Sequence, residues 1–246
     1  MKPIIEKIFV EIDGTKIQVE VIRERRRSVR FSVVKDGVNV RMPIMLTPEQ
    51  EREQFKRLHE WLNKINQKKD NFLEKFESKT YQTGDVLEVG TRRYYLDIYL
   101  EDKKNHSARI KNNTITLNLS QHDNEANRIK AISQLLSRVV SGDFLPEISR
   151  RVKEWNAIYF KKNIKSINLK YNHSNWGSCS RDGNINLSSR LLFAPDDVID
   201  YVIVHELSHL VEMNHSDRFW KVVSDVMPNY EEKEKWLSMN GNKCNF

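Results

Sequence analysis

The sequence predicts an α+β protein, with a β-rich N-terminal part followed by a helical part that contains a small sheet and the candidate active site. Three observations predict this class. Apolar residues alternate with polar ones around Asp-Gly turns near the N-terminus, they recur at helical spacing from Glu125 onward, and two short alternating runs precede a helix with an H-E-x-x-H motif. We expect the two parts to cover residues 1–120 and 121–246.

The composition is typical of a globular chain that can bury a sizeable core. Of 246 residues, 39% are hydrophobic and 30% are charged, which excludes a disordered polyelectrolyte. No window approaches the ~20 apolar residues of a membrane span, and charges interrupt the N-terminus where a signal peptide would be apolar. Cys179 and Cys244 are too few for a disulfide framework and lack C-x-x-C spacing. We therefore expect a cytoplasmic protein with no membrane contact.

Two hairpins open the expected fold. Asp13-Gly14 and Asp36-Gly37 each lie between alternating apolar runs, which is the strongest short-range signal for a hairpin. The four strands are expected at residues 7–12, 15–22, 28–34 and 38–42.

An arginine run follows the second expected strand and contributes to the net charge of +7. Such a run can bind phosphates by releasing counterions, so nucleic acid is one expected partner. The alternative is that the arginines alternate with apolar residues on a strand and solvate its outer face, because the run has no interleaved aromatic residues. The arginines are Arg23, Arg25, Arg26, Arg27 and Arg30.

One long helix is expected from about residue 48 to 76. Thr47 supplies an N-cap, Pro48 occupies the first helical position and acidic residues follow in the first turn. Apolar residues then continue at helical spacing as far as Phe76. Further strands are expected at 86–89, 94–100 and 110–119, with polar turns at Gly90 and Asn112-Asn113.

The second part begins with apolar residues at helical spacing, which predict one long helix or two, broken near Gly142. Residues 164–171 and 184–188 alternate as strands on either side of a turn at Asp182-Gly183. The segment 194–197 then opens the motif helix, with proline in its first turn and two carboxylates at the positive end of its dipole. This order predicts a site helix that lies on a sheet.

His205, Glu206 and His209 form the H-E-x-x-H motif. Histidines four residues apart project from one face of a helix on successive turns, so both imidazoles can bind the same tetrahedral metal ion. Glu206 lies about 100° around the helix, where it can reach a water molecule on that ion. The residues before the motif are apolar, and a buried imidazole pair beside a carboxylate needs a partner such as a metal. We expect Zn²⁺ as the metal and Glu206 as the general base.

A catalytic zinc usually has three protein ligands, and His215 is the expected third. It follows the motif after five residues, which is the metzincin spacing, although Glu212 replaces the glycine of that pattern. A left-handed turn at Asn214 and an N-cap at Ser216, before a helix over 217–226, would return His215 to the site. A carboxylate is the competing ligand, from Glu212, Glu231, Glu232 or Glu234. His59, His106, His122 and His173 fit no ligand spacing.

Four segments of the second part carry a family resemblance: W-G-S-C-S at 176–180, R-L-L-F-A-P at 190–195, Y-V-I-V-H-E-L-S-H-L at 201–210 and N-H-S-D-R-F-W at 214–220. They closely resemble the YgjP-like family of zinc metallopeptidases or predicted metal-dependent hydrolases, which is related to SprT-like peptidases. The resemblance is dense from about Trp155 onward. It is looser earlier, where an arginine-rich strand pair precedes a helix with Trp61-Leu62. Asn175 and Ser189 depart from the family pattern, which tends to have arginine and tryptophan there.

This resemblance implies a zincin-like metallopeptidase domain in which His205, His209 and His215 bind zinc and Glu206 is catalytic. A peptide or protein is then the expected substrate, cleaved by water that the metal activates. Two alternatives stay open. One is a metal-dependent hydrolase of a nucleotide-like substrate, although the chain has no Gly-rich phosphate loop. The other is a nucleic-acid-associated protein in which the arginine run binds and the zinc is structural or acts on a bound partner.

Substrate contacts are expected from Trp176, Asn186 and Arg190, which precede the motif helix. The strand 184–188 could pair its edge with an extended peptide. The donor that stabilises the oxyanion is left open among Tyr201, Tyr230, His173 and Arg190.

Overall fold

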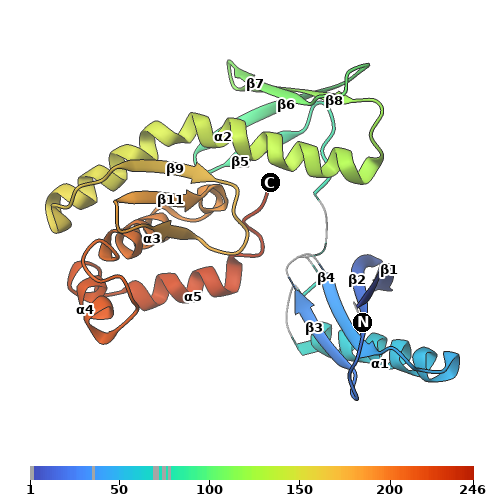
Figure 1. The fold of residues 1–246 in the computed structure, drawn as a ribbon. Helices are drawn as coiled ribbons and strands as arrows, with labels where there is room; N and C mark the ends of the chain where they lie inside the picture. Colours follow the sequence, from blue (N-terminus) through green and yellow to red (C-terminus); the bar gives the residue numbers. More distant parts are fainter. Residues whose placement is uncertain (1–2, 35–36, 69–71, 74–75, 77–78) are drawn as a thin grey trace. The chain divides into compact units, whose positions relative to one another are not determined.

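The computed structural model describes residues 3–34, 37–68, 72–73, 76 and 79–246, and it divides the chain into two compact units, Met1–Ser78 and Lys79–Phe246 (Figure 1). Each unit has its own apolar core. The mixed α+β class is confirmed. The division differs from the expected boundary after residue 120, because the second sheet shares its core with the helix that follows it rather than with the first sheet.

The N-terminal unit is a four-stranded sheet with one helix. The sheet order is β1-β2-β4-β3, with antiparallel pairs at its two ends and a parallel pair in the middle. Asp13 and Gly14 have positive φ, as the expected first turn requires, whereas Asp36 of the second turn lies outside the described residues. The strands are β1 (Ile4–Ile12), β2 (Thr15–Glu24), β3 (Arg30–Val34) and β4 (Gly37–Pro43).

Helix α1 (Pro48–Lys68) closes the core of this unit with Leu58 and Leu62. Thr47 and Gln50 exchange hydrogen bonds between side chain and backbone, a reciprocal cap that fixes the helix start. The helix is shorter than the expected 48–76, since the backbone at Phe72–Leu73 forms a turn.

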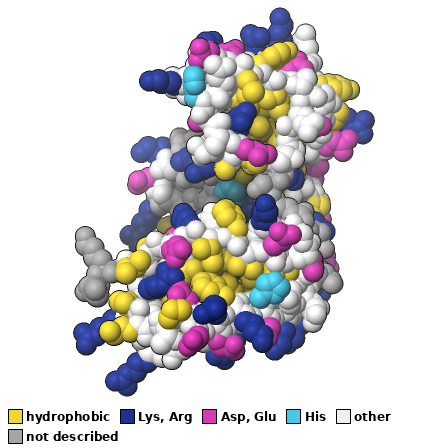
Figure 2. Space-filling view, turned by 90° about the vertical axis from the view of Figure 1, so that its right-hand side faces the viewer, with side chains coloured by type: hydrophobic (Ala, Val, Ile, Leu, Met, Phe, Trp, Pro, Cys, Tyr) yellow, Lys and Arg dark blue, Asp and Glu magenta, His cyan; other side chains and the backbone are white. Residues whose placement is uncertain are grey.

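Some apolar side chains of this unit stay at the surface. Ile4, Ile5 and Phe9 on the edge strand β1 are each more than half exposed. Figure 2 shows hydrophobic side chains surrounded by charged ones in the lower half of that view.

The second unit begins with the same topology. Its first sheet has the order β5-β6-β8-β7, again with antiparallel outer pairs and a parallel middle pair, and a helix follows it. The chain therefore repeats one ββββα arrangement. The strands are β5 (Val86–Val89), β6 (Arg92–Glu101), β7 (Ser107–Lys111) and β8 (Thr114–Ser120). Asn112 and Asn113 form the tight turn between β7 and β8, both with positive φ.

Helix α2 (Glu125–Trp155) is continuous over 31 residues, so the expected break near Gly142 is wrong. Gly142 and Pro146 each disfavour an interior helical position. Buried side chains nevertheless line the helix on both sides of them, from Ile132 to Val152, and this burial outweighs the local penalties. The helix lies between two sheets and contacts both (Figure 1).

The third sheet has the order β10-β11-β9, with β9 (Ser166–Lys170) parallel and β10 (Gly177–Cys179) antiparallel to β11 (Asn184–Ser188). A π-helical turn after α2 leads into it. Helix α3 (Asp196–Ser208) packs on β10, β11 and α2, so the expected helix on a sheet is confirmed. Two further helices, α4 (Asp217–Val226) and α5 (Tyr230–Asn240), complete the unit. In the described part of the chain, no helix is long and apolar enough to cross a membrane.

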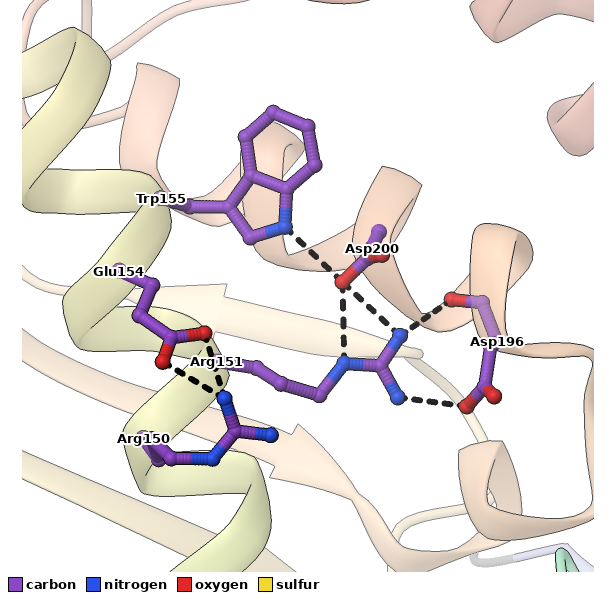
Figure 3. A network of polar contacts seen from close by, with 6 residues as sticks. All are labelled: Arg150, Arg151, Glu154, Trp155, Asp196 and Asp200. Atoms are coloured by element: carbon purple, nitrogen blue, oxygen red, sulfur yellow. Dashed lines mark hydrogen bonds and ion pairs between the residues drawn. The ribbon is translucent and has the colours of Figure 1, made fainter.

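Arg151 of α2 joins the start of α3 to the scaffold (Figure 3). Its guanidinium donates to a carboxylate oxygen of Asp196 at 2.6 Å and of Asp200 at 3.1 Å, and it also contacts the Asp196 carbonyl. Trp155 Nε1 donates to the same Asp200 oxygen at 2.9 Å. The Arg151 side chain is 12% exposed and that of Asp200 is 24% exposed, so this ion pair between the two helices is largely shielded, whereas Asp196 is at the surface.

We predict that Arg151→Ala lowers the free energy of unfolding by about 2 kcal/mol, because Asp200 loses its partner in a partly buried place. Arg150 is the matched control. It pairs with Glu154 at the surface, where both side chains are more than half exposed, so Arg150→Ala should cost less than about 0.5 kcal/mol. Urea denaturation of both variants measures the difference, and equal losses would show that the α2–α3 ion pair contributes nothing specific.

Candidate metal centre

Helix α3 brings the motif residues to the wall of a cavity. Its interior residues are almost all buried, from Val198 to Ser208, so the helix is held on several sides. Glu206 lies on its last turn, and the helix ends where His209 takes the C-cap position. The two histidines share one face because they are four residues apart.

A compact turn returns the chain to the site after His209. The nitrogens of Val211 and Glu212 both donate to the Ser208 carbonyl. Asn214 does not adopt the expected left-handed conformation; its side chain instead accepts a hydrogen bond from the Ser216 nitrogen. Ser216 does precede α4, as expected, but its hydroxyl makes no capping hydrogen bond. The chain therefore turns back toward the site through the Asn214 side chain, without the glycine that the metzincin pattern has at the position of Glu212.

The three histidines His205, His209 and His215 meet in one cluster. Their ligand atoms all lie within 4.8 Å of one another, and the Nε2 atoms of His205 and His215 are 3.0 Å apart. Two nitrogens bound to one tetrahedral zinc at ~2.0–2.1 Å would be about 3.3 Å apart, so the observed spacing is close to that of a metal site. Within the described part of the chain, this is the group whose donors could hold a metal.

One histidine of the cluster is oriented by the backbone. His209 Nδ1 lies 3.2 Å from the Glu212 carbonyl oxygen, which can only accept a hydrogen bond. The contact favours the tautomer with a proton on Nδ1 and leaves Nε2 free as a donor to a metal. Burial and the neighbouring histidines lower the pKa of His205 to about 4, so its imidazole is neutral as ligation requires.

Phe219 of α4 forms the floor beneath all three imidazoles. Its ring centroid is 4.5 Å from that of His209, 4.7 Å from that of His215 and 4.9 Å from that of His205. Phe219 is fully buried, so it fixes the imidazole planes from below. Its place in the site was not expected, because only the fold of α4 against α3 brings it there.

Glu206 is a buried carboxylate without a full set of partners. It is 4% exposed, its Oε2 atom has no hydrogen-bond partner among the described residues, and burial raises its pKa to about 8. An unpartnered buried oxygen is costly unless a ligand satisfies it. Three imidazoles beside such an oxygen fit a divalent metal ion.

Gly177 on β10 makes room for this carboxylate. A Cβ atom at Gly177 would lie 2.7 Å from both Cγ and Cδ of Glu206 and would overlap Oε1. Only glycine lets the strand approach the helix so closely at this point. The W-G-S-C-S segment therefore has a definite role, although nothing in its local sequence relates Gly177 to a residue on a later helix.

A cavity of about 660 Å³ opens at the cluster. Trp176, Met213 and Leu237 supply apolar walls, and Tyr201 lines it from α3. Its lining in the described residues includes the carboxylates Glu206 and Glu234 but neither lysine nor arginine.

Trp176 thus lies where substrate contacts were expected, but Asn186 and Arg190 do not line this cavity. Asn186 faces its own sheet, where its side chain donates to Ser178 Oγ at 3.3 Å. Arg190 donates to the carbonyls of Cys244, His173 and Gly241 and stacks on Trp176 at 4.5 Å, so it braces the wall instead of contacting a ligand.

The expectation that strand 184–188 offers a free edge to a peptide is wrong. Strand β11 (Asn184–Ser188) is the central strand of its sheet, paired on both sides, and therefore has no free edge. The edge strand at the cavity is β10, whose three residues all line it. The sequence showed alternation in β11 but could not show its neighbours.

Of the residues left open as oxyanion donors, Tyr201 lines the cavity, whereas Tyr230, His173 and Arg190 do not. Burial raises the pKa of Tyr201, which keeps its hydroxyl protonated and able to donate. Among the competing carboxylates, Glu234 lines the cavity, while the acidic groups of Glu212, Glu231 and Glu232 are not part of the histidine cluster.

Comparisons with known proteins give a family match and distant likenesses to solved structures, two of which are described here. The model of the YgjP-like metallopeptidase domain matches residues 27–240. The metallopeptidase zymogen of Pyrococcus abyssi abylysin is similar over 37% of this chain and 92% of its own, with 21% identity and a TM-score of 0.34. The metallopeptidase zymogen of Methanocaldococcus jannaschii jannalysin is similar over 37% of this chain and 93% of its own, with 20% identity and a TM-score of 0.33. None of the curated proteins matches the chain.

We predict that Gly177→Ala lowers the free energy of unfolding by about 1–3 kcal/mol, because the new methyl group overlaps a buried side chain that has little room to move. Gly142→Ala is the matched control. Its Cβ would meet no atom within 4 Å in the middle of α2, so it should stabilise by up to about 1 kcal/mol.

A Glu206→Ala protein tests whether the overlap with Glu206 is the cause of this loss. If Glu206 is the group that Gly177 accommodates, Gly177→Ala should cost far less in a Glu206→Ala protein, and thermal denaturation of the four combinations gives this coupling directly. Equal costs in the two backgrounds would mean that the glycine serves another contact.

Proposed function

We propose that this chain, which belongs to the YgjP-like metallopeptidase family, hydrolyses peptide bonds with a zinc ion held by His205, His209 and His215 and with Glu206 as its general base. The observation that carries the proposal is the meeting of three imidazoles with a buried carboxylate whose Oε2 has no partner among the described residues. Three nitrogen donors with an open position suit zinc better than magnesium or calcium, which take oxygen ligands.

When bound, zinc would supply a Lewis acid that polarises the scissile carbonyl and lowers the pKa of the attacking water. Glu206 would take the proton from that water on Oε2 and later deliver it to the leaving amine nitrogen. A carboxylate beside the water suits both transfers, because it can accept the proton and later release it.

Other residues of the cavity would bind and orient the peptide substrate. The Tyr201 hydroxyl would donate to the carbonyl oxygen of a bound peptide; its place in the cavity lining and its raised pKa support this role. The free edge of β10 can pair with an extended peptide, and Trp176 offers an apolar wall beside it.

The cavity favours a peptide over a nucleotide. Phosphate groups need cations, but the lining in the described residues carries the carboxylates Glu206 and Glu234 without any lysine or arginine. A closed structural zinc site would need a fourth protein ligand, and the cluster offers three. Neither alternative has an observation in its favour at this site. The cytoplasmic location stays a prediction.

We predict about one zinc per chain in protein purified without added metal, measured by elemental analysis. His205→Ala with His209→Ala should abolish it. His215→Ala should weaken zinc binding at least ~10-fold in competition with a chelator, because it removes one of three ligands. Glu212→Ala is the control and should keep the affinity of the unchanged protein. If the order of these two variants were reversed, the third ligand would be a carboxylate.

For the general base, we predict that Glu206→Gln keeps the zinc and the fold but lowers peptide hydrolysis at least ~100-fold, since an amide cannot accept the proton. Glu212→Gln is a matched change outside the cavity lining and should keep the rate. Turnover is measured on a peptide library with zinc content checked in each sample. A Glu206→Gln protein that cleaved its best peptide at the unchanged rate would exclude this residue as the base.

A further inference from the structure

A second concave surface lies in the N-terminal unit, between α1 and the segment that enters β3. This groove has a volume of about 710 Å³, which falls in the range of ligand sites. Its floor includes Phe31 of β3 and Trp61 of α1, whose ring centroids are 5.6 Å apart. Its rim carries three cations, Arg27, Arg57 and Lys64, and one carboxylate, Glu60.

The helix presents these side chains together. Arg57, Trp61 and Lys64 are spaced four and three residues apart, so they share one face of α1. The aromatic ring therefore lies between two positive charges along the helix. Arg27, in the segment before β3, also lines the groove.

The three cations of the rim are uncompensated. Each is exposed, and none forms an ion pair with another described residue. Three other arginines of the same unit are paired: Arg23 with Glu6 and Glu51, and Arg26 and Arg41 both with Glu24. Arg25, Arg30 and Arg52 are exposed and form no ion pair with a described residue, but they do not line the groove. The groove therefore combines three unpaired cations with two half-buried aromatic rings.

We propose that this groove binds single-stranded nucleic acid, with phosphates at Arg27, Arg57 and Lys64 and an unstacked base against Trp61. Cations that follow a backbone and an aromatic face that accepts any base are the two elements of sequence-tolerant single-strand binding. A duplex hides its base faces, so it would use only the charges. An acidic peptide would likewise leave the aromatic floor without a matched partner.

This assignment changes the set of arginines expected from the sequence. Arg23 and Arg26 are engaged in ion pairs, and only Arg27 of that run lines the groove. Arg57, Lys64 and Trp61 were absent from the expectation because they lie on a later helix. The arginine run contains no aromatic residue, and Trp61 of α1 provides one in the folded unit.

Fluorescence anisotropy of a labelled dT12 strand on the full chain tests the proposal. Arg27→Ala/Arg57→Ala/Lys64→Ala should raise the Kd at least ten-fold. The slope of log K against log salt, about −2 for three phosphate contacts on a single strand, should fall toward zero. Arg25→Ala/Arg30→Ala/Lys56→Ala removes the same charge from exposed positions outside the groove and should change the Kd less than three-fold.

A second readout reports on the aromatic floor. Trp61 is the one tryptophan in residues 1–78, so the emission lost in Trp61→Phe isolates its signal. Saturating dT12 should quench that signal in the unchanged protein. Circular dichroism of each variant checks that the fold is kept.

Three results would overturn the proposal. They are similar weakening by the two triple variants, competition by a twelve-residue polyglutamate as strong as that by unlabelled dT12, and binding that leaves the Trp61 emission unchanged. The first result would mean that binding depends only on the net charge of the protein. The second would assign the groove to acidic peptides, and the third would mean that dT12 binds away from Trp61.

Discussion

The candidate site depends on one constraint, the burial of the Glu206 carboxylate. A carboxyl group that is 4% exposed, with one oxygen that finds no partner in the described part of the chain, is unfavourable in a stable protein unless something else compensates for it. Several neighbours are arranged around this requirement. Gly177 leaves room that a Cβ atom would fill, burial lowers the pKa of His205, and Phe219 packs beneath the imidazoles. The packing around the site therefore accommodates the buried Glu206 carboxyl group.

The scaffold can hold such a group because α3 is fixed at both ends. Its start is joined to α2 by Arg151, and its end is closed by the turn that returns His215. Between these points the helix is buried on several sides. A helix held in this way cannot offset the cost of the buried carboxyl group by sliding or fraying, so protonation of Glu206 or a ligand at Oε2 has to offset it.

The parts of the structure that depend on neighbours in sequence could be predicted. The hairpin at Asp13-Gly14, the start of α1 at Pro48 and the shared face of His205 and His209 all follow from local geometry. The parts that depend on distant packing could not. The continuity of α2 through Gly142 rests on burial against two sheets, and the central place of β11 rests on pairing with β9 and β10. Gly177 and Phe219 join the site only through the fold, since their own sequence neighbours carry no metal-site signal.

The repeated ββββα arrangement bears on how the chain is made. In the first copy, every strand pairs with a partner inside residues 4–43 and the helix follows at once, so this copy can assemble as soon as it leaves the ribosome. The second copy lacks that independence. Its helix α2 also packs on β9 and α3, which are synthesised later. During translation the second sheet and its helix would expose apolar surface until the third sheet arrives, which makes the middle of the chain the segment most exposed to aggregation and to chaperones.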